Sequence, residues 1–360
     1  MSAAGGDGRA GGLRVAVVGA TGAVGTVMLR LLRSRGFPAS EIVPFASSRS
    51  VGRELEGGLV VQPLEEDTIQ GFDVALFSAG ATRSREWAQR FVDAGAVVVD
   101  NSSAFRMVDD VPLVVSEVNP EALDGHNGIV ANPNCTTMVA MLPLKALHDE
   151  FSLVSMVATS YQAAGGAGQS GIDELAGQIA PLAADVQQLC DDGATAAAKV
   201  DHAVHNATLA FNVVPLLGTL GDDDHTDEER KLRNESRKIL GIPDLAVSPL
   251  CVRVPVMVGH GVAVRATFAR AVDLDRALEV LAAFPGMVLD DLPTPLEWAG
   301  RDEVAVGRVR RDLGNPTCTL NFFVVGDNLL KGAALNTVQL AEVLLERGLV
   351  GSAATRAPAA

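Results

Sequence analysis

The segment that most constrains the fold lies near the N-terminus, where an apolar run leads into a glycine-rich turn. Residues 13–18 are mostly apolar, and three glycines follow at Gly19, Gly22 and Gly25. Beyond the turn, apolar residues recur at helical spacing through 27–32. This order predicts a strand, a tight turn and a helix that starts directly from the turn, the first unit of a parallel sheet with helical crossovers.

The rest of the chain shows two kinds of pattern. Short, almost continuously apolar runs predict three more buried strands, at 42–46, 74–77 and 97–99, with a helix over 85–93. From residue 153, longer runs predict an antiparallel or mixed sheet, with strands at 154–160, 262–269 and 317–325. Thr226 and Glu229 have capping-box spacing for a helix that reaches Leu240, and 335–348 predicts a final helix.

The length of 360 residues exceeds the size at which one hydrophobic core usually stops growing, so two domains are expected. We predict an α/β chain with an N-terminal Rossmann-type parallel-sheet domain and a second, α+β domain that contains a mixed sheet. The first domain would comprise 13–134 with 333–349, and the second 135–332. The chain ends, 1–12 and 350–360, are predicted to be disordered tails, the first of them not a signal peptide.

The charge balance narrows the choice of partners. The formal net charge is −15 at pH 7, so a nucleic acid or an anionic membrane surface would be repelled. No apolar run approaches the length that spans a membrane. The four cysteines lie far apart without paired spacing, which favours reduced thiols over a disulfide framework or a metal site. We therefore expect a cytoplasmic protein with a small-molecule substrate, and basic side chains placed locally for any anionic group.

The glycine-rich turn also predicts a ligand. It allows the backbone to approach a pyrophosphate at a helix N-terminus, and it comprises Gly19, Ala20, Thr21, Gly22, Ala23 and Val24. The spacing is a variant of the usual G-x-G-x-x-G, and the alternative is a purely structural turn. The second strand is followed by a stretch without an acidic residue, Ser47, Ser48, Arg49 and Ser50. An arginine among hydroxyl groups suits a 2′-phosphate, so NADP is favoured over NAD, with a solvated polar loop as the alternative.

Cys135 is a candidate nucleophile. It lies in the stretch Asn132-Pro133-Asn134-Cys135-Thr136-Thr137, where a turn-rich loop gives way to an apolar run. This predicts a thiol at a helix N-terminus, where backbone amides and the helix dipole stabilise a thiolate and a developing oxyanion. The alternative is a small core residue, which is the more common role of a cysteine.

Four further segments carry polar side chains where strands and turns would bring them to a cleft. They are 101–106, which follows the fourth strand, 160–166, 228–231 and 253–261. His260 is a candidate acid or base because its ordinary pKa lies near neutral pH. A structural histidine, and solvated surface charges in the other segments, are the alternatives.

In order and spacing, these segments closely resemble the aspartate-β-semialdehyde dehydrogenase family. The resemblance runs from Arg14 to about Glu342 and also includes 306–308 and the stretch 327–334. It implies the NADPH-dependent reduction of 4-phosphoaspartate to aspartate semialdehyde with release of phosphate, in the biosynthesis of lysine and diaminopimelate, methionine, threonine and isoleucine. It also implies a homodimer formed through the second domain.

The resemblance further implies roles for single residues. Cys135 would form a thioester, His260 would manage the proton, and Gln162 would orient the intermediate. The residues implied to bind substrate are Arg253 for the α-carboxylate, Glu228 for the ammonium group, Arg106 and Lys231 for phosphate, and Asn134. The cofactor contacts that it adds are Ser78, Ala79, Gly80, Gly166 and Gln339, and it implies no metal.

Two other functions are compatible with parts of this pattern. N-acetyl-γ-glutamyl-phosphate reductase shares the cysteine and histidine chemistry, but typically has glycine where this chain has Asn134, and its substrate lacks the free ammonium that Glu228 suits. A catalytically silent NADP-binding homologue would have lost the cysteine or the histidine. Four positions depart from the usual pattern, Gly165, His225, Leu250 and Gly261, which puts nearby hydrogen bonds in question. Core packing is predicted for Cys251 and Cys318.

Overall fold

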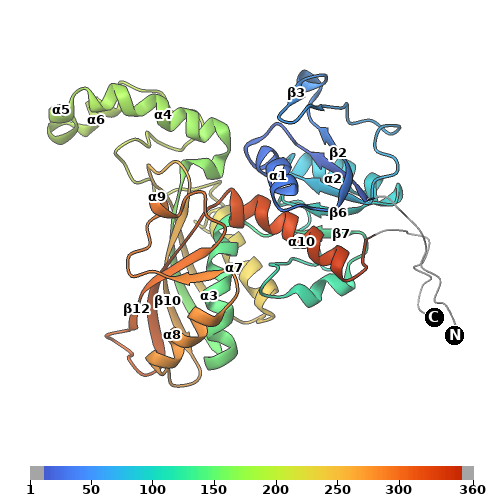
Figure 1. Cartoon of the computed structure of the whole chain (residues 1–360). Coiled ribbons are helices and arrows are strands. Elements are labelled where there is room, and N and C mark those ends of the chain that lie inside the picture. The colour runs from blue at the N-terminus through green and yellow to red at the C-terminus, as the bar shows by residue number, and fades with distance from the viewer. Residues whose placement is uncertain (1–11, 351–360) are drawn as a thin grey trace, which may run out of the picture.

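The computed structural model describes residues 12–350, and the predicted tails lie outside the described residues except for Gly12 and Val350. The first sheet is five-stranded and parallel, with the order β2-β1-β5-β6-β7 (Figure 1). Its strands are β1 (Leu13–Val18), β2 (Ala39–Phe45), β5 (Val74–Phe77), β6 (Val97–Asp100) and β7 (Ile129–Ala131). A small antiparallel hairpin, β3 (Glu54–Leu55) and β4 (Leu59–Val60), lies beyond β2.

Helices cover both faces of the first sheet. Val15 and Val17 of β1 belong to a buried cluster with α1 (Ala23–Ser34) and α10 (Leu335–Glu346). Ala16 and Val18 belong to the other large cluster, with Trp87 and Phe91 of α2 (Ala81–Asp93). Since successive side chains of a strand point to opposite faces, β1 is buried on both sides, which explains its continuous apolar run.

The second sheet has six strands in the order β11-β12-β13-β10-β8-β9. Its strands are β8 (Leu153–Gln162), β9 (Ala246–Arg253), β10 (His260–Phe268), β11 (Met287–Leu289), β12 (Val304–Arg311) and β13 (Thr319–Gly326). β10 pairs antiparallel with β8 and β13, whereas β8 and β9 run parallel, so the sheet is mixed. Three helices pack against one another or the sheet, α3 (Cys135–Phe151), α7 (Asp227–Leu240) and α8 (Leu274–Ala283).

A helical arm extends from the second sheet, away from the rest of the molecule (Figure 1). It consists of α4 (Gln169–Ala183), α5 (Val186–Asp191) and α6 (Gly193–Ala197). The carboxylate of Glu174 accepts the backbone N–H groups of three consecutive residues, 203–205, and thereby fixes the returning chain to α4. Shorter elements are α9 (Pro295–Trp298), η1 (Ser48–Ser50), η2 (Pro120–Gly125), η3 (Ala164–Ala167) and η4 (Leu330–Ala334).

The predicted fold class is confirmed: a parallel-sheet α/β domain is followed by a domain with a mixed sheet. The capping box at Thr226 and Glu229 is present at the start of α7. The second strand begins earlier than predicted, at Ala39, and the final helix is preceded by the π-helical turn η4. The arm helices were not predicted. The domain boundaries stay a prediction, because one buried cluster contains residues of both sheets.

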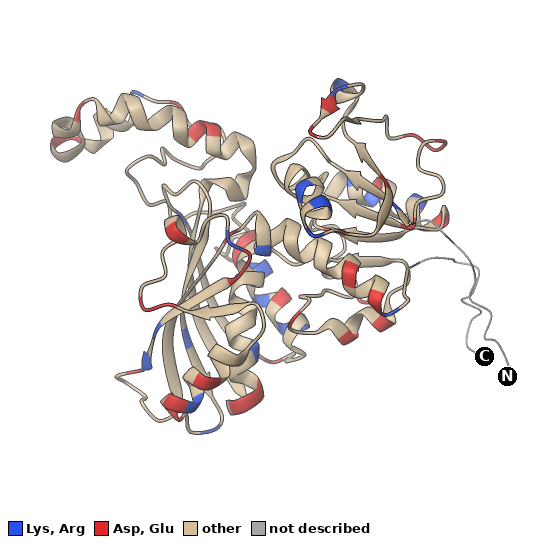
Figure 2. Ribbon diagram, viewed as in Figure 1, with Lys and Arg blue, Asp and Glu red and all other residues tan. Residues whose placement is uncertain are grey.

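Figure 2 marks Lys, Arg, Asp and Glu along the ribbon, and positions of both signs are mixed over the parts that contain the two sheets. Within residues 12–350, no helix is both long and apolar enough to cross a membrane.

Candidate active site

Cys135 is the first residue of α3, as the sequence predicted. The side chain of Asn134 caps this helix, because its Oδ1 accepts the N–H groups of Thr136 at 2.9 Å and Thr137 at 3.2 Å. Gly332 of η4 packs against the cysteine, and a Cβ added to Gly332 would lie 3.0 Å from Cβ of Cys135. The thiol is therefore held at a helix N-terminus with a wall built from the C-terminal part of the chain.

His260, the first residue of β10, contacts the thiol directly. Its Nε2 lies 3.2 Å from Sγ of Cys135, and its Nδ1 accepts the backbone N–H of Ala163 at 3.0 Å. A backbone N–H can only donate, so a neutral imidazole here carries its proton on Nε2. The ring therefore presents a hydrogen-bond donor to the sulfur and to any oxygen bound beside it.

Burial favours the neutral forms of both groups. It lowers the pKa of His260 from 6.5 to about 3, and the positive charge of Arg253 acts in the same direction. Burial raises the pKa of the Cys135 thiol from 9.0 to about 11, and Glu228 adds to this, whereas Arg106 and Arg253 oppose it. At neutral pH the pair therefore consists of a thiol and a neutral imidazole.

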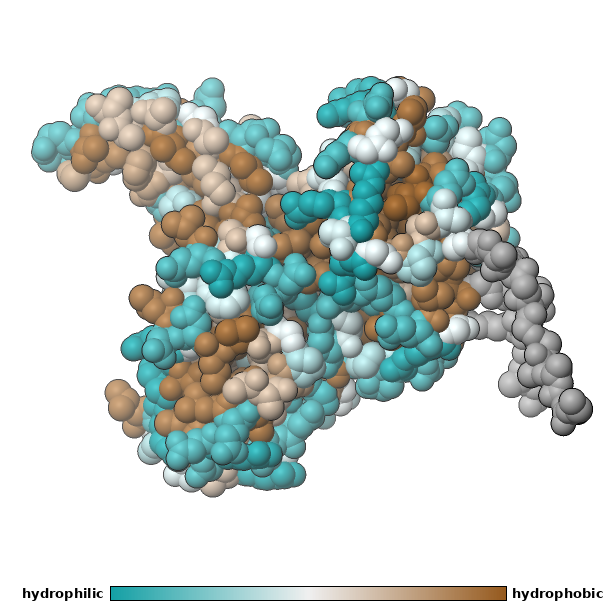
Figure 3. All heavy atoms as spheres, in the orientation of Figure 1, coloured by the Kyte–Doolittle hydropathy of each residue, from teal (hydrophilic) through white to brown (hydrophobic). Residues whose placement is uncertain are grey.

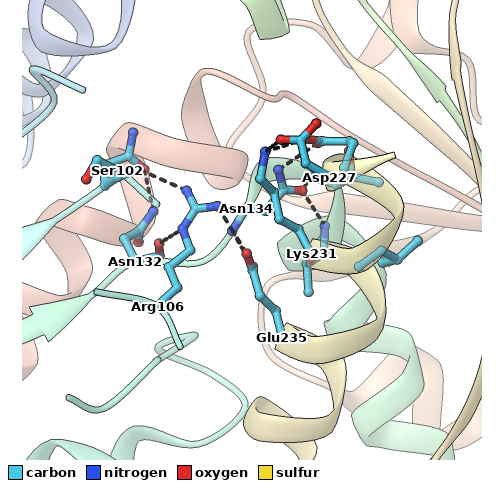
Figure 4. A network of polar contacts seen from close by, with 12 residues as sticks. Ser102, Arg106, Asn132, Asn134, Asp227, Lys231 and Glu235 are labelled. Atoms are coloured by element: carbon cyan, nitrogen blue, oxygen red, sulfur yellow. Dashed lines mark hydrogen bonds and ion pairs between the residues drawn. The ribbon is translucent and has the colours of Figure 1, made fainter. Parts of the chain in front are cut away.

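Arg106 is held in place by three hydrogen bonds (Figure 4). Its Nε donates to the carbonyl of Asn132 at 2.9 Å, and its Nη2 donates to the carbonyl of Asn101 at 2.9 Å. Its Nη1 donates to Oε1 of Glu235 at 3.1 Å. The other oxygen of Glu235 accepts the backbone N–H of Asn134 at 2.7 Å. The guanidinium is thus connected to the residue that precedes the thiol.

Glu228 and Lys231 lie on one face of α7 and pair with each other. Lys231 Nζ donates to Glu228 Oε2 at 3.0 Å and to Asp227 Oδ2 at 2.6 Å (Figure 4). The other oxygen of Glu228 accepts Nδ2 of Asn134 at 2.7 Å. Asn134 therefore contacts two buried carboxylates, Glu228 through its side chain and Glu235 through its backbone.

Three adjacent strands bring Gln162, Arg253 and His260 to one end of the second sheet. Gln162 and Arg253 are paired residues at the ends of the parallel strands β8 and β9, and His260 begins the antiparallel β10 beside them. Gln162 Nε2 donates to Ser160 Oγ at 3.2 Å, and Arg253 Nη1 donates to the carbonyl of Ala163 at 2.6 Å. The topology of the sheet thus assembles side chains that lie almost a hundred residues apart.

A cavity of about 320 Å³ lies beside Cys135; Gln162 and Arg253 line it, whereas His260 does not. It is lined by eight residues that were predicted for catalysis, substrate binding or cofactor binding: Arg106, Asn134, Cys135, Gln162, Gly166, Glu228, Lys231 and Arg253. Val24 and Gly80, predicted to contact the cofactor, line it as well. The predicted substrate residues are therefore brought together around the thiol.

A second cavity, of about 260 Å³, lies at the glycine-rich turn. The predicted cofactor residues that line it are Gly19, Thr21, Gly22, Ser47, Ser78 and Ala79, and Arg83 of α2 lines it too. Gly19 has φ +90°, and a Cβ there would lie 2.3 Å from the carbonyl oxygen of Ser78. A Cβ at Gly22 would meet only the carbonyl of Gly19, at 3.4 Å, so this glycine leaves room for a ligand instead. The residues therefore fit a pyrophosphate bound at the start of α1.

The remaining predicted cofactor residues do not line either of these cavities. They are Ala20, Ala23, Ser48, Arg49, Ser50 and Gln339. The amide of Gln339 is engaged elsewhere, since it accepts from Lys331 Nζ at 2.8 Å and donates to Glu117 at 3.1 Å. The predicted cofactor contact of Gln339 consequently has no support from this geometry.

Two residues that sequence reasoning did not single out belong to the site, Glu235 and Asn328. Asn328 is 2% exposed and lines the catalytic cavity, and its Oδ1 accepts the N–H of Gly259, next to His260, at 2.8 Å. Its Nδ2 has no hydrogen-bond partner within the described residues. The sequence signal available for Asn328 was its position in the stretch 327–334, where it is the one amide side chain.

Two of the four unusual positions have a packing explanation. A Cβ at Gly261 would lie 2.5 Å from the ring of Phe323, and a Cβ at Gly165 would lie 2.8 Å from the carbonyl oxygen of Met257. Larger residues there would require a shift of these neighbours. The cysteines are free thiols, and Cys251 is buried as predicted, whereas Cys318 is only half-buried because it lies just before β13.

Comparison with known proteins identifies the family. The model for the NAD-binding domain of semialdehyde dehydrogenases matches residues 14–126, and the model for their dimerisation domain matches residues 144–331. The chain is 51% identical to the aspartate-semialdehyde dehydrogenase of Streptomyces akiyoshiensis over 335 residues, which are 92% of this chain and 98% of the relative.

Solved structures agree with this result. The chain is similar to aspartate semialdehyde dehydrogenase II of Vibrio cholerae complexed with ASA, with a TM-score of 0.86, 40% identity and coverage of 93% of this chain and 98% of that one. The enzyme of Candida albicans with NADP has a TM-score of 0.72, 26% identity and coverage of 94% and 99%. These similarities indicate a nicotinamide cofactor and an oligomer. The chain belongs to the aspartate-semialdehyde dehydrogenase family.

Proposed function

We propose that this protein converts 4-phospho-L-aspartate to L-aspartate 4-semialdehyde with NADPH, and catalyses the reverse reaction with phosphate, through a thioester on Cys135. One observation carries the proposal: Sγ of Cys135 lies 3.2 Å from Nε2 of His260 at a helix N-terminus, in a cavity lined by Arg106 and Arg253. A nucleophile, a proton donor and two cationic groups for an anionic substrate therefore meet at one point.

The chemistry of Cys135 follows from its surroundings. Sulfur attacks the acyl carbon of the substrate, the bond from that carbon to the phosphate oxygen breaks, and the thiol proton leaves with the phosphate. The product is a thioester on Cys135. NADPH, when bound, supplies the hydride that reduces the thioester carbon. Nε2–H of His260 donates to the oxygen that becomes negative, and the C–S bond then breaks to release the aldehyde and a thiolate, which takes up a proton.

The two ends of the substrate suit different residues. Arg253 offers a guanidinium fork for the α-carboxylate, and Glu228 offers a carboxylate for the ammonium group. Arg106 and Lys231 supply the positive charge for phosphate, which the chain as a whole lacks. Gln162 and Asn134 are neutral and line the same cavity, where they orient the acyl group and the cysteine loop respectively.

NADP is the cofactor that the glycine-rich cavity suits best. Among the residues that line it, all within the described range, there is no acidic side chain to bind ribose hydroxyls, whereas Ser47 and Arg83 are present. Arg49 follows on the adjacent turn η1 and is exposed, so its guanidinium is free to reach a 2′-phosphate. Asn328 lines the catalytic cavity, and its Nδ2, which has no hydrogen-bond partner within the described residues, would be available to donate to the cofactor when it is bound.

We propose a homodimer in the cytoplasm. Apolar side chains are exposed along the arm and on the segment that follows it, at Val186, Phe211, Val213, Leu216 and Leu220. Figure 3 shows apolar surface along the arm in one view. The open face of the second sheet adds three exposed side chains, Val157, Tyr161 and Leu250. A second copy of the chain would cover such surface.

The test is an assay of the purified protein. It should reduce NADP⁺ with aspartate semialdehyde only when phosphate or arsenate is present, and substitution of Cys135 by alanine should abolish the reaction. N-acetylglutamate semialdehyde and NAD⁺ serve as comparison substrates. Activity that survives without Cys135, or that prefers the acetylated aldehyde, would contradict the proposal.

A further inference from the structure

We propose that Glu235 is a positioning residue that holds Arg106 and the cysteine loop, residues 132–135, in one fixed relation. The inference rests on the proposed function in that Arg106 binds the phosphate and Cys135 is the nucleophile. Glu235 is not among the residues that line the cavity, and it has no hydrogen bond to the thiol within the described residues. It acts through the two groups that it holds.

The two oxygens of the Glu235 carboxylate accept hydrogen bonds from two different segments of the chain. Its side chain is 1% exposed, on the third turn of α7. Oε1 accepts Nη1 of Arg106 at 3.1 Å, and Oε2 accepts the backbone N–H of Asn134 at 2.7 Å (Figure 4). Arg106 follows β6 of the first sheet, and Asn134 directly precedes Cys135. A single side chain therefore connects the phosphate-binding guanidinium to the loop that aims the sulfur.

The arrangement requires two acceptor oxygens. A glutamine of the same shape has one acceptor oxygen and one NH₂ group, which can only donate. In the E235Q protein, the NH₂ group of the glutamine would therefore face either Arg106 or the N–H of Asn134, both of which are donors. One buried donor would be left without an acceptor, and it would lose the free energy of its hydration without compensation. Aspartate keeps both oxygens but is shorter by one methylene, so it cannot reach both partners without a shift.

The guanidinium of Arg106 has donors left for a ligand. Of its five N–H groups, three are taken within the described structure, by the carbonyl oxygens of Asn132 and Asn101 and by Glu235. Because these bonds fix the plane of the guanidinium, the remaining donors have a set direction. A phosphate oxygen in the cavity that Arg106 and Cys135 both line would meet them without reorganisation.

A purely electrostatic role and a positioning role of Glu235 predict opposite changes in the affinity for phosphate when this residue is replaced. The negative charge of Glu235 beside Arg106 repels an incoming anion, so its removal alone would tighten the binding of phosphate. If Glu235 instead sets the orientation of Arg106, its replacement by glutamine weakens the binding of phosphate. The sign of the change in affinity therefore separates a positioning role from a purely electrostatic one.

Glu229, on the same helix, provides a matched control. It is buried, and both of its oxygens also accept backbone N–H groups, from Thr226 at 2.8 Å and from Cys251 at 3.2 Å. It has no hydrogen bond to Arg106 or to the cysteine loop among the described residues. The E229Q protein therefore reproduces the loss of a buried carboxylate and of helix stability without disturbing the relation between Arg106 and Cys135.

The experiment compares the full-length wild-type, E235Q, E235D and E229Q proteins. Inorganic phosphate binding is measured by calorimetry, the alkylation rate of Cys135 by iodoacetamide with mass spectrometry, and stability by thermal unfolding. For E235Q we expect phosphate binding about tenfold weaker and an altered alkylation rate, since a hydrogen bond to a charged group is lost. E229Q should lower the melting temperature and leave phosphate binding and alkylation within about twofold of wild type.

Two results would overturn the inference. One is phosphate binding in folded E235Q that is unchanged or tighter, and the other is a loss of binding in E229Q as large as in E235Q. If E235Q does not fold, E235D serves as the test, because aspartate keeps the negative charge but is too short for its oxygens to reach both partners. Unchanged phosphate binding in E235D would then contradict a positioning role. Neither phosphate binding nor alkylation of Cys135 requires turnover. A protein that lacks dehydrogenase activity would therefore contradict the proposed function but not the positioning role of Glu235.

Discussion

Nε2 of His260 lies 3.2 Å from Sγ of Cys135, while Nδ1 of the same ring accepts the N–H of Ala163. The backbone thereby decides which ring nitrogen carries the proton, and it is the nitrogen that faces the sulfur. His260 is therefore arranged as a donor to sulfur or oxygen, rather than as a base that waits for the thiol proton.

Cys135→Ala should abolish the phosphate-dependent reduction of NADP⁺, by at least about a thousandfold, because Cys135 is the one cysteine among the described residues that lines the catalytic cavity. Cys318→Ser is the control and should retain activity, since Cys318 is a half-buried free thiol that is not among the described residues lining the catalytic cavity. Rates are measured by the absorbance of NADPH, and trapping of an acyl group on Cys135 is checked by mass spectrometry. An acyl adduct on another cysteine would contradict the assignment.

Acid should destabilise the protein through His260. Its pKa is about 3 in the folded protein against 6.5 ordinarily, so below pH 6.5 the unfolded chain binds more protons at this residue. The stabilisation is complete above pH 6.5 and is lost towards pH 3, at up to about 1.4 kcal/mol per pH unit. Denaturant unfolding of wild type and His260→Gln between pH 7 and 4 checks this, and the variant should show a shallower slope. Equal slopes would contradict the buried neutral ring.

Gly19 and Gly22 should behave differently when replaced by alanine. Gly19→Ala should cost about 1–3 kcal/mol of unfolding free energy, because the backbone has φ +90° and the new Cβ would meet the carbonyl of Ser78. Gly22→Ala should cost less than about 1 kcal/mol, yet weaken NADPH binding, since the methyl group would stand in the cavity. Denaturant unfolding and fluorescence titration with NADPH separate the two effects. Equal loss of stability in both would be inconsistent with this geometry.

Arg49→Asp should lower the preference for NADP over NAD. A carboxylate at this place repels a 2′-phosphate and suits ribose hydroxyls, so the ratio of kcat/KM values should fall by at least about tenfold. Arg30→Asp makes the same change of charge at an exposed position of α1 and serves as the control. A ratio that changes equally in both variants would point to the overall charge of the protein instead.

Lys331→Met should be among the most destabilising single substitutions. Lys331 is 1% exposed, and its Nζ donates to Glu117 at 2.5 Å and to Gln339 at 2.8 Å. Removing it leaves the carboxylate of Glu117, only 13% exposed, without its cation, which costs up to about 3–5 kcal/mol. The double variant with Glu117→Gln should recover part of this loss in denaturant unfolding. A single variant within about 1 kcal/mol of wild type would contradict the prediction.

Local signals made part of the site predictable. Thr226 and Glu229 mark the start of α7 by a contact within one turn, and Asn134 and Cys135 mark the start of α3 in the same way. The strand and turn around Gly19 are equally local. Such features depend on neighbours in the sequence, so the sequence alone displays them.

Long-range packing made the rest unpredictable. Glu235 and Lys331 carry charges that, in a sequence, resemble those of any solvated helix face. Their burial depends on Asn134, which is 101 residues from Glu235, and on Glu117, which is 214 residues from Lys331. The cofactor contact of Gln339, implied by the family resemblance, stays a prediction, and nothing local in the sequence reveals that its amide is bonded to Lys331 and Glu117.

The contact between Gly332 and Cys135 also has a consequence during synthesis. The residue that closes one side of the thiol is made almost two hundred residues after the thiol itself, together with the other residues of η4. A nascent chain still attached to the ribosome therefore carries Cys135 without that wall. Reactivity of this cysteine on the ribosome should resemble that of an exposed thiol until η4 has emerged.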